Sequence, residues 1–352
     1  RVAIAEQGAA GQQQVHQFKR GAFARVVHVP LVGHAQDAHL AAPQRLHHRD
    51  ALEGVAADVE DDAVPVGRDD RVGPAREAAA AELEVETKSV GVMSTGLIGR
   101  FMDMHKVRYG ISRAARELSS GRDADSLITE AIMTTDTIKK ECTVRVRLGD
   151  GTLVYISAIS KGSGMISPHL KVLHGTTLSL VTTDAKLTPK FKNTFQQILD
   201  DSLNMVTVDG DQSTNDTCIM LANGMAAGAA ADNDPAFIEA LTFVMTKLAK
   251  TIAMDGEGAT KLIEVQVTGA ETKEDARMAA KKILNSPLVK SAIFGSDPNY
   301  GRIMMALGNS GCKFNLEDVH LTIKGGDMEV PILDSGAPVF QEERSVEVVR
   351  MA

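Results

Sequence analysis

The stretch "CTVRVRLGDGTLVYISAIS", residues 142–160, carries a strong signal of local structure. Apolar and polar residues alternate on both sides of Gly149-Asp150-Gly151. A short glycine-containing segment between two such runs is typical of a β-hairpin. We therefore predict two antiparallel strands that meet at this turn.

Helical and strand patterns alternate after the hairpin. In residues 187–204, Thr188 is the expected N-cap and Pro189 the expected first helical residue, because proline is favoured there. A second helix is predicted at 234–254. The remaining pattern predicts, in order, a strand at 261–269, a helix at 273–284, a strand at 288–295, a helix from Tyr300 and two strands within 320–333. This order indicates the α/β (α+β) class.

Two further elements are predicted before the hairpin. Residues 90–93 form a short apolar run that leads into a turn at Thr95-Gly96, and a helical pattern covers about 104–118. The composition changes near residue 83. Residues 1–82 are rich in Ala, Arg, His and Gln without a sustained period, and we interpret them as a segment of low order or a wrongly translated reading frame. We expect no metal site among the six histidines there: His16, His28, His34, His39, His47 and His48.

Composition bounds the class of protein. The chain has 352 residues, is 43% hydrophobic and carries a formal net charge of −8, which disfavours a nucleic acid or an anionic membrane as the main partner. No apolar run approaches the length of a membrane span, and no signal peptide is expected. Cys142, Cys218 and Cys312 are widely spaced, as in reduced cytosolic proteins. We expect a cytoplasmic enzyme.

The acidic segment "VDGDQSTNDT", residues 208–217, allows several interpretations. A calcium loop that started at Asp209 would need glycine and glutamate where Thr214 and Met220 stand, so a metal site is not expected. A turn that caps a helix beginning near Thr217 fits its residue types better. Two glycine segments, 161–168 and 255–261, lack the spacing of a phosphate-binding loop and are interpreted as turns.

Threonine is frequent in residues 133–137 and 175–185. A threonine can act as a nucleophile without a histidine when its own α-amino group, freed by chain cleavage, is the base. The pKa of such an amine is about 7.7–8.0. Cleavage requires a small preceding residue, and Gly175-Thr176 meets that requirement. The same threonines would also suit ordinary strands, because they are β-branched.

Seven motifs resemble, in the same order, those of the ornithine acetyltransferase family (ArgJ, glutamate N-acetyltransferase), from about residue 86 to about 340. They are "MSTGLIGR", "AIMTTDT", "KGSGMISP", "VTTDAKL", "DGDQSTNDT", "DGEGATKLIEVQVTGA" and "NSPLVKSAIFGSDPNYGR". The resemblance implies an ArgJ-like layered α/β sandwich, built of helices and mostly antiparallel or mixed sheets. It also implies a precursor that cleaves itself before a threonine into α and β chains, expected here as 83–175 and 176–352.

The resemblance also implies an activity. The new N-terminal threonine takes acetyl from N2-acetyl-ornithine and passes it to glutamate in a ping-pong reaction of cyclic arginine biosynthesis. No cofactor or metal is implied, although acetyl-CoA is an additional acetyl donor for some members. The expected assembly is (αβ)2, without nucleic acid or membrane.

Single residues match the motifs of the family. Thr176 would be the nucleophile, with Thr177 as the alternative, and cleavage would fall between Gly175 and Thr176. The resemblance assigns Thr95 and Gly96 to the oxyanion hole, where fixed donors stabilise the developing charge. It assigns contacts with the amino-acid substrate to these residues: Thr134, Lys161, Thr176 and Glu257. We expect the aspartates of 208–217 to cap a helix and to brace the site.

The chain departs from the family pattern at three places. The spacer between Lys161 and Thr176 is longer than usual, residues 1–82 do not match, and the sequence ends before the C-terminal family segment. Two alternatives therefore stay open. One is an N-terminal-nucleophile amidohydrolase or aminopeptidase, in which water resolves the acyl-threonine. The other is a catalytically inactive, truncated homologue.

Overall fold

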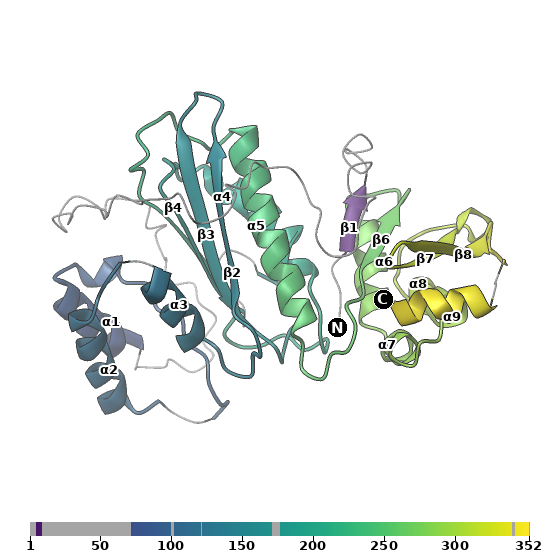
Figure 1. Cartoon of the computed structure of the whole chain (residues 1–352), viewed down its shortest axis with the longest axis horizontal. Helices are drawn as coiled ribbons and strands as arrows, with labels where there is room; N and C mark the ends of the chain where they lie inside the picture. The colour runs from purple at the N-terminus through teal and green to yellow at the C-terminus, as the bar shows by residue number, and fades with distance from the viewer. Residues whose placement is uncertain are drawn as a thin grey trace.

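The computed structural model describes residues 5–8, 72–99, 102–120, 122–170, 177–339 and 342–351, in which helices and strands are mixed along the chain (Figure 1). The helices are α1 Val72–Leu83, α2 Met104–Arg116, α3 Arg122–Ala131, α4 Phe191–Asp200, α5 Pro235–Met254, α6 Lys273–Leu284, α7 Pro287–Phe294, α8 Tyr300–Gly308 and α9 Glu342–Met351. The strands are β1 Ala5–Gly8, β2 Lys140–Arg147, β3 Leu153–Lys161, β4 Leu178–Thr183, β5 Thr217–Ala222, β6 Val265–Thr268, β7 Leu321–Gly325, β8 Met328–Asp334 and β9 Ala337–Pro338. Short 3-10 helices lie at Thr87–Ser89, Leu203–Met205 and Leu316–Asp318. This mixture confirms the predicted α/β class. The six histidines discussed above, and most of residues 1–82, lie outside the described residues.

A four-stranded sheet in the order β2-β3-β4-β5 occupies the middle of Figure 1. β2 and β3 form the predicted hairpin, and their antiparallel register runs from Lys140↔Ser160 to Arg147↔Leu153. β4 pairs antiparallel with β3 and parallel with β5. The sheet is therefore of the mixed type that was predicted.

The core lies between this sheet and α5, which packs across β2 and β3 (Figure 1). α5 begins at the predicted Asp234-Pro235 pair, where the Asp234 carboxylate accepts hydrogen bonds from the N–H groups of Ala236 and Phe237. Its buried residues are Phe237, Ala240, Leu241, Val244, Met245, Leu248, Ala249, Ile252 and Ala253. Along β2, buried and exposed residues alternate, so the sheet contributes one apolar face to this core.

The apolar face of the sheet gives a stability prediction. Val154 is fully buried, whereas its neighbour Leu153 points to the other face and is exposed. Val154→Ala removes buried apolar area and leaves a cavity, so we expect it to lower the free energy of unfolding by about 2 kcal/mol. Leu153→Ala, the matched control, should change it by less than about 0.5 kcal/mol. Urea unfolding of both variants measures the difference, and equal losses would contradict the assigned faces.

The C-terminal elements, from β6 onward, lie on the right of Figure 1. β1 pairs parallel with β6, and α6 packs against both strands. β7, β8 and β9 form an antiparallel sheet that α9 covers. The predicted strand pair within 320–333 is thus confirmed, whereas no element like α9 was expected at the end of the chain.

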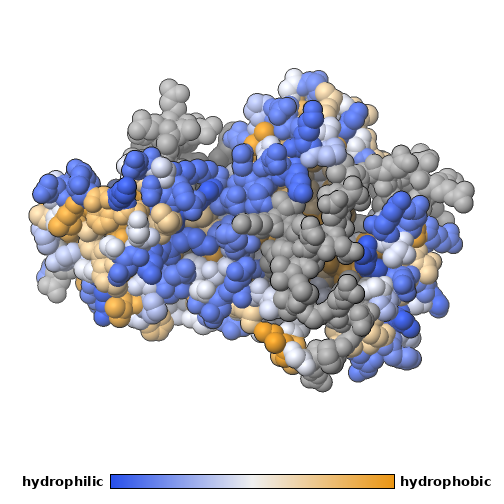
Figure 2. Space-filling view, turned by 180° about the vertical axis from the view of Figure 1, so that it is seen from behind, coloured by the Kyte–Doolittle hydropathy of each residue, from blue (hydrophilic) through white to orange (hydrophobic). Residues whose placement is uncertain are grey.

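The described surface seen from behind is mostly hydrophilic, with apolar residues in separate patches (Figure 2). Among the residues that the structure describes, no helix is both long and apolar enough to cross a lipid bilayer.

Two predicted element types are wrong. Residues 288–295 were expected to be a strand but lie mostly in α7. The Ser286 hydroxyl accepts from Val289 N–H at 3.3 Å, and Pro287 is the first helical residue. A short apolar run fits a strand or a helix, and here the capping serine and the proline favour the helix. The helix expected near Thr217 is the strand β5, because its backbone completes the sheet beside β4.

Three further predictions differ from the structure. The strand expected at 261–269 is limited to β6, Val265–Thr268. Residues 90–93 are irregular rather than a strand. Gly91, which Ile219 of β5 approaches closely, interrupts them, and glycine weakens a strand. Helix α4 begins at Phe191 rather than at Pro189, because Pro189 and Lys190 form a turn in which the N–H groups of Phe191 and Lys192 donate to residues three positions earlier. The predicted apolar face of α4 is confirmed.

Candidate active site

The end of the central sheet nearest the predicted cleavage point gathers the candidate residues. β3 ends at Lys161, β4 begins at Leu178 and β5 begins at Thr217. Leu178 pairs with Lys161 on one side and with Thr217 on the other. Lys161, Thr177 and Asp216 therefore lie at the same end of three adjacent strands.

Lys161 and Thr134 are in direct contact. The Lys161 side chain is 5% exposed, and its ammonium donates to the Thr134 hydroxyl at 3.2 Å. Burial lowers the pKa of Lys161, as does the charge of Lys140, whereas Asp136 and Asp216 act in the opposite direction. Thr134 itself is exposed. A buried ammonium that ends beside an exposed hydroxyl can bind a carboxylate from solution.

Glu257 joins this pair through the loop that follows Lys161. Its N–H donates to the carbonyl oxygen of Ser163 at 3.0 Å. Its carboxylate packs so closely on Gly164 that a Cβ there would lie 2.7 Å from it. Gly162 has a φ of +152°, which other residues rarely adopt. The two glycines of this segment thus allow the loop that directly follows Lys161 to pack closely against Glu257.

The other predicted site residues are less closely defined. Thr95 is half-buried and Gly96 exposed, in the irregular segment that passes beside β5. Their role in an oxyanion hole stays a prediction. Gly175 and Thr176 lie outside the described residues, so the nucleophile and the cleavage point stay predictions too. Thr177 is fully buried, and its carbonyl accepts from Thr217 N–H at 2.9 Å.

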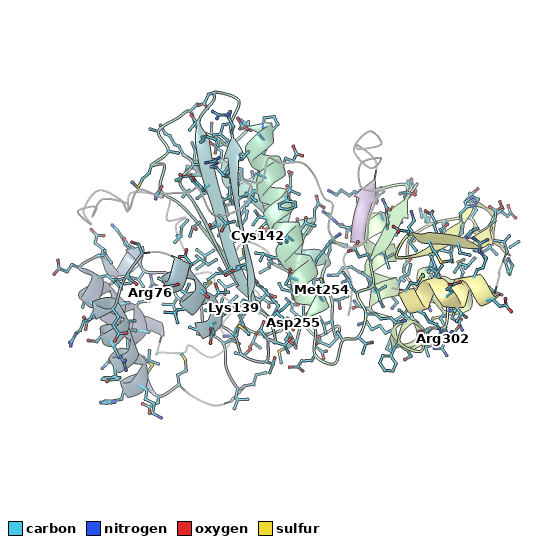
Figure 3. All side chains as sticks on the ribbon, in the orientation of Figure 1. Arg76, Lys139, Cys142, Met254, Asp255 and Arg302 are labelled. Atoms are coloured by element: carbon cyan, nitrogen blue, oxygen red, sulfur yellow. The ribbon has the colours of Figure 1, made fainter. Side chains whose placement is uncertain are left out.

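Sequence reasoning missed a buried ionic network beside these residues. The Lys140 ammonium lies 2.5 Å from the carboxylates of both Asp136 and Asp255. Figure 3 labels Asp255, at the end of α5, and Lys139, which precedes Lys140 at the start of β2. One signal was available in the sequence. Lys140 lies an even number of positions from Cys142 and from the buried valines of β2, so it lies on the same buried face of the strand.

The acidic segment 208–217 has two different roles. Asp209 accepts from Ile166 N–H at 3.0 Å, so it braces the loop that follows Lys161. The carbonyl oxygen of Ile166 in turn accepts from Val208 N–H at 2.7 Å. The expected bracing is thereby supported for Asp209, while the expected helix cap is wrong because β5 follows.

Asp216 is a buried acid at the start of β5. Asp216 is 2% exposed, and burial raises the pKa of its carboxyl group to about 7. The Thr177 backbone N–H and the Lys161 ammonium both lower the pKa of Asp216, but it stays above the ordinary value of an aspartate. The carboxyl therefore changes charge near neutrality.

Asp216 gives a prediction on stability against pH. Because its folded-state pKa exceeds its unfolded value, its contribution to stability is full below about pH 4 and is lost as the pH rises through about 7. Asp216→Asn removes this loss, so we expect the variant to be about 4 kcal/mol more stable than the parent at pH 8 and little changed at pH 4. Urea unfolding at both values measures this, with exposed Asp211→Asn as the control. A gain that is the same at both values would exclude titration of Asp216 as its source.

Comparison with known proteins supplies independent information. A family model described as ArgJ family matches residues 67–352, a range that begins before the boundary predicted near residue 83. The chain is 45% identical over 278 residues to the arginine biosynthesis bifunctional protein ArgJ of Symbiobacterium thermophilum, which covers 77% of this chain and 66% of that protein. It is 42% identical over 271 residues to the glutamate N-acetyltransferase of Methanothermobacter thermautotrophicus, covering 77% of this chain and 65% of that protein. The chain thus spans slightly less than two thirds of the length of both relatives.

A solved structure is also similar. The crystal structure of arginine biosynthesis bifunctional protein argJ from Bacillus halodurans is 40% identical in sequence, with a TM-score of 0.46, and the match covers 49% of this chain and 82% of that one.

Proposed function

The chain belongs to the ArgJ family, and from that premise we propose that it transfers an acetyl group from N2-acetyl-ornithine to glutamate. The names of the two relatives, a bifunctional protein of arginine biosynthesis and a glutamate N-acetyltransferase, support this reaction. The proposed enzyme is a cytoplasmic acyltransferase that uses no cofactor, with acetyl-CoA as an additional donor to be tested.

The observation that carries the proposal is the convergence of three side chains of different chemistry at one end of the sheet. The Lys161 ammonium, which donates to the Thr134 hydroxyl, suits a substrate carboxylate, and the Glu257 carboxylate, which packs on the loop after Lys161, suits a substrate amino group. Both proposed substrates carry a carboxylate, and ornithine and glutamate both carry a free α-amino group when the acetyl is absent.

The proposed chemistry follows from an N-terminal threonine. The α-amine of Thr176 takes the proton of its own hydroxyl as the oxygen attacks the acetyl carbonyl. The C–N bond then breaks, the proton passes to the leaving amine, and ornithine departs from an acetyl-threonine. The amine of glutamate attacks this ester in the reverse sequence. In both halves, the Thr95 hydroxyl and the Gly96 N–H would stabilise the oxyanion.

The first test is the intact mass of the purified chain under denaturing conditions. We expect two fragments, the second beginning at Thr176, which would remain together in an (αβ)2 assembly when native. A second fragment that begins at Thr177 would move the nucleophile by one residue. A single chain of full mass would favour the inactive homologue.

The second test compares acetyl acceptors. Purified protein is incubated with N2-acetyl-ornithine and either glutamate or buffer alone, and both ornithine and N-acetylglutamate are measured. Ornithine release that requires glutamate supports the proposal. Equal release in buffer alone would instead favour the amidohydrolase, because water would then resolve the acyl-threonine.

A further inference from the structure

A lysine is fully buried at the start of the sheet. Lys140 is 0% exposed, and it extends from the first position of β2 on the face that carries Cys142 and Val144. Removing an ammonium from water costs several kcal/mol unless charged partners and hydrogen bonds replace the water. Such a residue in place of another valine therefore needs a reason other than stability.

Each of the two carboxylate residues that bind Lys140 also binds both the segment before β2 and the loop after β3. Asp136 accepts from the N–H of Thr134 at 3.0 Å and from the N–H of Gly162 at 2.6 Å. Burial opposes ionisation of Asp136, but these bonds and the one from Lys140 outweigh it and lower its pKa. The group is thus a charged acceptor at neutral pH, and charged acceptors make the stronger hydrogen bonds.

Asp255 binds the same two segments at different residues. It accepts from both the N–H (3.0 Å) and the hydroxyl of Thr137. Its own carbonyl oxygen accepts from the Ser163 hydroxyl at 2.7 Å. Burial opposes its ionisation, yet the bonds from Lys140 and Thr137 lower its pKa. Asp255 therefore connects the segment before β2 with the loop after β3.

The loops connected in this way are those that carry the proposed substrate contacts. Thr134 lies two residues before Asp136, Lys161 directly precedes Gly162, and Glu257 lies two residues after Asp255. The sequence distance between Lys140 and Asp255 is 115 residues, so these loops have no local reason to share one geometry. The network centred on Lys140 supplies that reason.

We infer that Lys140 is a positioning residue, which fixes the relative placement of Thr134, Lys161 and Glu257 through Asp136 and Asp255 without touching the substrate. The inference rests on the proposed function for the roles of those three residues. The geometric part, that Lys140 orders the three loops, does not depend on it.

The test compares three variants. Lys140→Met removes the central charge. The triple variant D136N/K140M/D255N removes all three charges with little change in shape, so it avoids two unpaired buried carboxylates. Lys139→Met is the matched control, because Lys139 is the preceding lysine but makes a partly exposed ion pair with Glu130.

Hydrogen exchange measures the ordering of the loops without any substrate. We expect the triple variant to speed exchange of the Gly162 and Thr137 amides at least tenfold and to leave the amide of Leu148, at the far end of the hairpin, unchanged. Lys140→Met should show the same pattern, and the triple variant decides the matter if that single variant fails to fold. Wild-type rates at Gly162 and Thr137 in the triple variant would overturn the inference.

Kinetics separate positioning from mere stability. We expect the Tm of the triple variant to rise above that of Lys140→Met and to come close to that of the parent. Its kcat/KM for the amino-acid substrates should stay at least tenfold below that of the parent, mostly because of a higher KM. Recovery of both quantities would show that the network is only structural and would overturn the inference. If the parent chain transfers no acetyl group, the proposed function fails, and the exchange rates still decide the role of Lys140.

Discussion

Thr176→Ala is expected to abolish acetyl transfer, with a fall in rate of about 10⁴-fold or more, and to leave the chain uncut. The reason is that one hydroxyl serves both events. It attacks the preceding carbonyl during cleavage, and it then carries the acetyl group between the two substrates. Intact mass and the release of ornithine measure the two effects on the same sample.

Two neighbouring threonines serve as comparisons. Thr182 is exposed on β4, so Thr182→Ala should cleave and react like the parent. Thr177→Ala tests the alternative nucleophile, since Thr177 is buried at the start of the same strand. Activity retained by Thr176→Ala and lost in Thr177→Ala would transfer the nucleophilic role to Thr177. Activity retained by both would refute the threonine mechanism.

Lys161→Met is expected to lower kcat/KM for N2-acetyl-ornithine and for glutamate by about 10³-fold. Removing one partner of a desolvated, charge-assisted hydrogen bond costs about 2–5 kcal/mol, and Lys161 is buried, with its ammonium beside the Thr134 hydroxyl. Cleavage of the chain should persist, because no substrate carboxylate takes part in it. Steady-state kinetics with each substrate measure the effect.

The control for this variant is again Lys139→Met, which removes a lysine of the same region from the surface rather than from the site. It should leave both KM values within about twofold of the parent. If Lys161→Met leaves KM unchanged but lowers kcat, Lys161 acts on the reacting atoms rather than on the carboxylate. If neither constant changes, the proposed substrate site is wrong.

Local patterns in the sequence were sufficient for several elements. The hairpin of β2 and β3 and the helices α5 and α6 were predicted close to their observed bounds. Their signals are a two-residue period, a proline at the first helical position and capping side chains, all of which act between residues a few positions apart. The errors fall where such signals conflict. The apolar run of α7 fits a strand, although a capping serine precedes it, and the polar turn before β5 suits the start of a helix as well as the start of a strand.

Sequence motifs were enough to identify the family and the α/β class, and they predict Thr134, Lys161 and Glu257 as substrate contacts. The contact of Lys161 with Thr134 and the place of Lys140 between Asp136 and Asp255 depend on the folding of distant segments together. A buried charge pairs with the groups that the fold places beside it, whatever their separation in the sequence. Strand order and the path of α5 bring Asp255 to the start of β2, and no pattern of neighbouring residues encodes that approach.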